Sequence, residues 1–124
     1  MNEHKEISAM SVLHVGINRS VRNLINSLFY DRPLRIHQVG TALQGLKALK
    51  RSSYDLIACD SYIPDINGAE FLHKFYDIQP NAGRLLVVIN GGRMPVLKTE
   101  AYVIVINEPK DKIQKHTKPL AATG

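Results

Sequence analysis

The chain has 124 residues, of which 44% are hydrophobic and 22% are charged, with one cysteine and a formal net charge of +5. A chain of this length suits one domain with a self-supporting core, and a single cysteine excludes an internal disulfide and a cysteine-based zinc site. Because no apolar run is long enough to span a membrane and the polar start is unlike a signal peptide, we expect a cytoplasmic protein that does not enter a membrane.

The excess of positive charge raises the question of a nucleic-acid partner. Arginine and lysine are spread along the chain, and they form no block interleaved with aromatic residues. Direct binding to nucleic acid is therefore not expected, and a solvated basic surface is the simpler interpretation.

The first half of the chain alternates between strand-like and helix-like segments. A β-branched run at residues 12–17 predicts a strand, and apolar residues at helical spacing over 20–30 predict a helix. Residues 34–39 alternate apolar and polar side chains, as a half-exposed strand does. Thr41 can then cap a helix whose leucines share one face.

The second half continues this alternation. Residues 54–59 form a continuous apolar run, which predicts a strand buried on both sides, and residues 67–78 carry apolar side chains at helical spacing. Further strands are predicted at 85–89 and 102–106. Five strands joined mainly by helical crossovers predict a doubly wound α/β fold of the (βα)5 type, a parallel sheet with helices on both faces.

Functional residues of such a sheet lie at the carboxyl ends of its strands. One of these ends lies in the segment DLIACDSYIPDINGAEFL, residues 55–72, where Asp60 closes the apolar run on an exposed edge and a Pro-Asp turn follows. This segment, together with the alternation of strands and helices, resembles the receiver domain of two-component response regulators.

The resemblance implies how the chain is organised. It covers residues 11–118 as a receiver-like domain of flavodoxin-like fold, with 1–10 as a flexible N-terminal segment and 119–124 as a tail or the start of a linker. The fourth helix, near 93–99, is expected to be short. Val105 takes the place of the aromatic residue that moves in the family's activation switch.

In this family an aspartate in the position of Asp60 accepts a phosphoryl group. The resemblance implies that Mg²⁺ is held there by two acids at the end of the first strand, by the acceptor aspartate and by a backbone carbonyl, here that of Tyr62. A Thr or Ser after the fourth strand and a Lys before a proline after the fifth would bind the phosphoryl group.

Only the acceptor aspartate matches this pattern of side chains. The other positions are degenerate, with Gly16 and Ile17 for the acid pair, Asn90 for the Thr or Ser, and Glu108 for the Lys. With two carboxylates lost, no metal site is expected, and we expect Ile17 to fill part of the metal's space. Glu108 would oppose an incoming phosphoryl group by roughly 3–4 kcal/mol at about 4–6 Å and an effective dielectric constant of about 20.

We therefore interpret the chain as an atypical receiver, or pseudo-receiver, that takes part in signal transduction through protein–protein contact. It would need no Mg-dependent phosphorylation, no cofactor and no enzyme activity. Its partner would be a signalling protein such as a histidine kinase, a phosphotransfer protein or an effector, and a homodimer stays open. The expected docking surface comprises Tyr62, Ile63, Pro64, Arg19 and Arg93.

Two alternatives stay open beside this interpretation. The chain could be a phosphorylatable receiver in which Asn90 and an arginine replace the lost groups. It could also be the regulatory domain of a longer DNA-binding transcription regulator. Asp60 itself could be purely structural, as a carboxylate that accepts backbone N–H bonds, and Cys59 is expected in the core.

Overall fold

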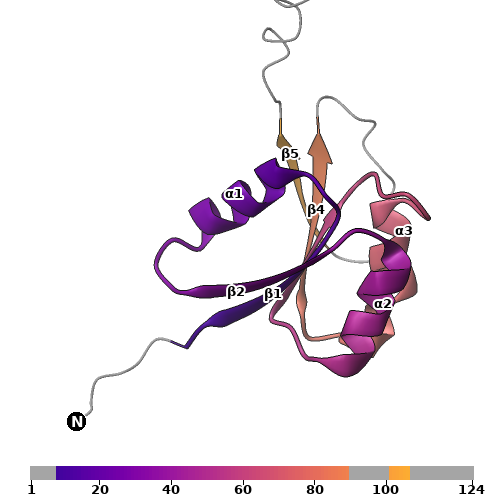
Figure 1. Ribbon diagram of the computed structural model, residues 1–124, viewed down its shortest axis with the longest axis horizontal. Coiled ribbons are helices and arrows are strands. Elements are labelled where there is room, and N and C mark those ends of the chain that lie inside the picture. The colour runs from indigo at the N-terminus through magenta and orange to yellow at the C-terminus, as the bar shows by residue number, and fades with distance from the viewer. Residues whose placement is uncertain (1–7, 90–100, 107–124) are drawn as a thin grey trace, which may run out of the picture.

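The computed structural model describes residues 8–89 and 101–106. Within them, five strands form one sheet in the order β2-β1-β3-β4-β5, and every neighbouring pair runs parallel (Figure 1). The strands are β1 (Met10–Val15), β2 (Leu34–Val39), β3 (Leu56–Asp60), β4 (Gly83–Ile89) and β5 (Tyr102–Ile106). Because β1 and β3 are parallel neighbours, their carboxyl ends lie side by side at one edge of the sheet.

Helices cover both faces of this sheet. The helix α1 (Arg19–Leu28) packs on one face, and α2 (Ala42–Arg51) and α3 (Gly68–Lys74) pack on the other (Figure 1). A short 3-10 turn, η1 (Tyr76–Ile78), follows α3. One apolar cluster fills the space between the sheet and α1, and a second fills the space between the sheet and the α2–α3 layer. The expected doubly wound parallel fold is confirmed.

Each of these three helices begins after a polar residue whose side chain accepts a backbone N–H bond from the first turn. The capping residues are Asn18 for α1, Thr41 for α2 and Asn67 for α3. Such caps satisfy N–H groups that have no partner within the helix. Thr41 was expected in this role from the sequence, and the structure confirms it.

Most element boundaries agree with the sequence, and the differences have local causes. β2 and β5 have the predicted ends, whereas β1 ends at Val15 because Gly16 takes a φ of +140° and turns the chain out of the strand. The predicted third helix is divided, since Phe75 leaves the helical region between α3 and η1. The fourth helix expected from the sequence, and with it Asn90, Arg93 and Glu108, lie outside the described residues.

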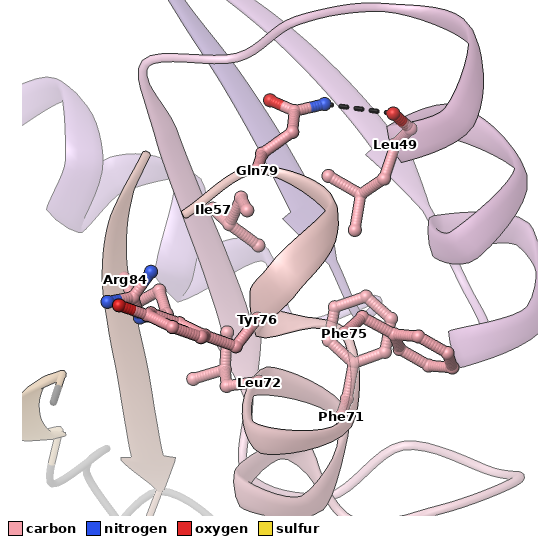
Figure 2. Close-up of a pocket in the computed structure, with 8 residues that line it drawn as sticks. All are labelled: Leu49, Ile57, Phe71, Leu72, Phe75, Tyr76, Gln79 and Arg84. Atoms are coloured by element: carbon pink, nitrogen blue, oxygen red, sulfur yellow. Dashed lines mark hydrogen bonds between the residues drawn. The ribbon is translucent and has the colours of Figure 1, made fainter. Parts of the chain in front are cut away.

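One glutamine links the end of α2 to the segment that precedes β3. Gln79 Oε1 accepts the backbone N–H of Tyr54 at 2.8 Å, and its Nε2 donates to the carbonyls of Leu49 and Ser52 at 2.9 and 2.6 Å. Figure 2 shows Gln79 above a small cavity between η1 and the sheet. That cavity measures about 10 Å³, which is room for about one water molecule and not for a ligand.

In the segments 8–89 and 101–106, no helix has the length and apolar character needed to cross a bilayer.

Candidate functional site

Asp60 is the last residue of β3, at the carboxyl edge of the sheet. The strand is buried along its whole length, and Asp60 itself is only 4% exposed. Our expectation of an exposed carboxylate was wrong, because the side chain points back over the neighbouring strand β1 instead of outward to solvent. A buried carboxylate needs hydrogen-bond partners, and its partners define the site.

Both oxygens of the Asp60 carboxylate have a partner. Oδ1 lies 2.8 Å from Nε2 of His14, and Oδ2 accepts the backbone N–H of Asn18 at 3.2 Å. His14 lies in β1 and is 2% exposed, so its contact with Asp60 is inside the fold. The Nδ1 atom of His14 has no hydrogen-bond partner among the described residues.

His14 is the residue that sequence reasoning missed. The sequence placed it inside a strand and offered no metal-ligand spacing, so it received no role. The available signal was the pairing of β1 beside β3, in which His14 lies opposite Ala58, two residues before Asp60. That signal becomes readable only when the register between the two strands is known.

Two glycines make room for Asp60. A Cβ atom on Gly16 would lie 2.1 Å from Cγ and from Oδ2 of Asp60, and one on Gly68 would lie 2.1 Å from the Asp60 carbonyl oxygen. Gly16 also has the positive φ that L-residues with side chains rarely adopt. The carboxylate therefore occupies the space that a side chain at position 16 would need.

Ile17 does not fill this space. Its side chain is 78% exposed, which corrects the expectation that it would occupy the metal's place. The reason is the turn at Gly16, which directs the next side chain away from the sheet edge. The backbone of this turn is held in place because the Gly16 carbonyl accepts a hydrogen bond from Nε2 of Gln38.

The donor atoms at this edge suit Mg²⁺ poorly. Mg²⁺ takes oxygen ligands in an octahedral arrangement. The Asp60 carboxylate is already bound to an imidazole and to a backbone amide, and the Asp65 carboxylate in the following loop is bound to two backbone amides of α2. Within residues 8–89 and 101–106, no three His, Cys, Asp or Glu side chains converge.

The expected docking residues in the loop after Asp60 differ in their exposure to solvent. Tyr62 is 89% exposed and Pro64 is also exposed, while Tyr62 forms an isolated antiparallel bridge with Asn67. Ile63, by contrast, is 5% exposed and packs in the core beneath the loop, so its predicted place on the docking surface was wrong. The buried side chain of Ile63 anchors the loop to the core and is not available to a partner. Arg19, at the start of α1, is exposed.

Asp65 fastens the same loop to α2. Its carboxylate accepts the backbone N–H groups of Ala42 and Leu43 at 2.9 and 3.0 Å, at the N-terminus of the helix. The bond from Ala42 is the main cause that lowers the pKa of Asp65 below its ordinary value, because an N–H donor favours the ionised form. The sequence predicted only that Asp65 lies in a turn. It did not predict the contact with α2, because that helix is distant from Asp65 in the sequence.

Cys59 lies next to Asp60 in the buried strand, fully enclosed, as the sequence predicted. Burial raises the pKa of its thiol well above the ordinary value, and the neighbouring charge of Asp60 raises it further. A thiol in this environment stays protonated and has little nucleophilic character.

Comparison with solved structures identifies the fold. A receiver domain of an HD-domain protein from Pseudomonas fluorescens Pf-5 matches with a TM-score of 0.64 and 16% identity, over 87% of this chain and 90% of that one. The response regulator TrrA from Thermotoga maritima matches with a TM-score of 0.62 and 20% identity, over 90% of this chain and 99% of that one. The chain therefore has the fold of CheY-like receiver domains.

Sequence comparison finds similarity over only part of the chain. No family model matches the chain. Two curated relatives, described as protein-glutamate methylesterase/protein-glutamine glutaminase, come from Rhizobium etli and Rhizobium johnstonii. Each is 34% identical over 71 residues, which is 56% of this chain and 20% of the relative. The chain thus matches about a fifth of the length of these relatives.

Proposed function

We propose that this chain is an atypical receiver domain that acts in signal transduction through protein–protein contact, without Mg-dependent phosphorylation of Asp60. The fold supports a role in signalling by its likeness to receiver domains. The observation that carries the proposal is the state of Asp60, whose two carboxylate oxygens are bound to His14 and to the Asn18 amide in the interior.

This geometry opposes phosphoryl transfer in two ways. An acceptor carboxylate must present an oxygen to the incoming phosphorus atom, and here the carboxylate is buried, with one oxygen against the His14 imidazole and the other against the Asn18 amide. A divalent ion would also find no carboxylate at Gly16 or Ile17, where the resemblance implies two acids. In this proposal the His14–Asp60 contact replaces the metal contact that the resemblance to phosphorylated receivers implies for Asp60.

The proposed contact face is the edge that carries the ends of β1 and β3. Tyr62 and Pro64 are exposed there, and Arg19 follows the end of β1. Tyrosine and arginine are enriched at protein interfaces because each combines apolar area with a polar group. We propose that the partner is a signalling protein that contacts this face. It would be a histidine kinase, a phosphotransfer protein or an effector.

Intact-mass spectrometry after incubation with phosphoramidate and Mg²⁺ tests the proposal. A phosphorylatable receiver domain treated in parallel serves as the positive control, and Asp60→Ala as the negative control. The mass of this chain should stay unchanged while the positive control gains one phosphoryl group. A stoichiometric gain that disappears in Asp60→Ala would overturn the proposal in favour of the phosphorylatable receiver.

The contact face has its own test. A photo-crosslinking amino acid at position 62 should give a discrete crosslinked species in cells, because this side chain is 89% exposed. The same amino acid at position 50, on the exposed side of α2, provides a matched control. Equal crosslinking at both positions would count against a specific face around Tyr62.

A further inference from the structure

The outer edge of the sheet at β2 carries a feature that the proposed function does not use. Two adjoining hollows of about 210 and about 450 Å³ lie between β2, the end of α2 and the segment after it, and they share His37, Ser52 and Tyr54. We call them together the β2 groove. It lies beside β2, the strand at one edge of the sheet, whereas Asp60 ends β3, and β1 lies between these two strands.

The backbone along this edge has open hydrogen-bonding groups. Among the residues that the structure describes, β2 pairs only with β1, and the carbonyls of Pro33 and Val39 accept N–H groups from the β1 side. Because successive residues of a strand point their backbone groups to opposite sides, residues 34, 36 and 38 direct theirs to the open edge. An added strand would find three N–H and three C=O groups there.

The side chains around the groove are basic. Arg35, Lys47 and Arg51 line it together with His37, and all four are exposed. None of the described residues that line it is acidic. These cations are separated in the sequence, and the position of α2 beside β2 brings them together around the groove.

The floor of the groove is fixed in the free protein. Nδ1 of His37 lies 2.8 Å from the hydroxyl of Tyr54, and the two rings stack with centroids 6.2 Å apart. Gln79 holds the backbone on both sides of this floor through Tyr54 and Ser52. A ligand would thus bind to a preformed surface and would lose little free energy in ordering it.

We infer that the β2 groove binds an extended acidic segment of a partner protein, which adds to β2 as a sixth strand. The open backbone groups bind the main chain of the segment. Side chains of a strand alternate between faces, so every second residue of the segment faces Arg35, Lys47 and Arg51, and carboxylates fit there. This interaction surface is independent of the face proposed around Tyr62.

The occupant is a peptide strand because of the open edge. A second copy of β2 would bring like charges together at Arg35 and is disfavoured. A nucleic acid would pair with the cations and stack on the aromatic floor, but it would leave the backbone groups at 34, 36 and 38 without partners.

Fluorescence anisotropy with a labelled seven-residue peptide that alternates glutamate and valine tests the inference. The peptide should bind the whole chain, and binding should weaken as salt rises. A peptide with glutamine in place of each glutamate should bind at least about tenfold more weakly. The double substitution Arg35→Glu with Arg51→Glu should have a similar effect, whereas Arg22→Glu on the opposite face should have none. Circular dichroism checks that each variant is folded.

Hydrogen exchange separates strand addition from a loose charge contact. The amides of Ile36 and Gln38 point to the open edge, so their exchange should slow when the peptide binds. Binding without this protection would overturn the inference, as would failure of the glutamate peptide to bind. Tighter binding of a ten-nucleotide oligothymidylate, or dimerisation of the chain through this edge, would overturn it as well.

Discussion

His14 and Asp60 face each other across two neighbouring strands, with Nε2 of the imidazole 2.8 Å from Oδ1 of the carboxylate. Both residues are almost completely buried, and they lie 46 residues apart in the sequence. The contact joins β1 to β3 at the edge where a CheY-like fold carries its chemistry. The contact buries the Asp60 carboxylate, whose other oxygen accepts the backbone N–H of Asn18.

Replacement of His14 should destabilise the fold. In His14→Ala, Oδ1 of Asp60 loses its partner inside the protein and a cavity forms beside it. We expect a loss of about 2–4 kcal/mol in the free energy of unfolding, measured by urea denaturation. His37→Ala, at an exposed position, should cost much less. Equal losses for the two variants would contradict the role given to His14.

Gly16 should not accept even a methyl group. Gly16→Ala places Cβ 2.1 Å from the Asp60 carboxylate and requires a φ of +140°. We expect a loss of about 3 kcal/mol or more in the free energy of unfolding. Gly40→Ala is the control, because its Cβ would meet only ordinary contacts at 3.5 Å and beyond. Unfolding of both variants at the same urea concentration would contradict the close packing of the Asp60 carboxylate against Gly16.

The stability that Asp65 provides should depend on pH. Its pKa is lowered in the folded state, mainly by the Ala42 N–H, so it stabilises the fold above the unfolded pKa of about 4. This contribution is lost as the pH falls through the folded pKa. Asp65→Asn should therefore lower Tm at pH 7, and the difference from the unchanged protein should shrink on acidification toward pH 3. A difference that grows on acidification would contradict this.

Cys59 should be unreactive in the folded protein. Burial and the charge of Asp60 raise the pKa of its thiol, so the reactive thiolate is scarce and shielded. A colorimetric thiol reagent should modify Cys59 at the rate of global unfolding and not faster. Rapid modification of the native protein at pH 8 would show that β3 opens locally.

The fold could be predicted from the sequence because its signals are local. The apolar run before Asp60 predicts a strand, and the leucines after Thr41 predict a helix. The alternation of strands and helices along the chain then implies a parallel sheet. The place of Asp60 at a strand end follows from the same reasoning.

The geometry of the site could not be predicted, because it depends on contacts between distant segments. His14 meets Asp60 only through the register of β1 and β3, and Ile17 turns outward only because of the φ at Gly16. Ile63 lies among polar and exposed neighbours in the sequence, and its burial depends on how the loop packs over the core.

The most direct test of the central claim is a Mg²⁺ titration followed by backbone amide signals. The N–H of Asn18 donates to Oδ2 of Asp60, so a metal at this carboxylate would have to disturb it. We expect no saturable shift of the Asn18 and Asp60 amides through the millimolar range. A saturable shift confined to these amides, and absent in Asp60→Asn, would contradict it.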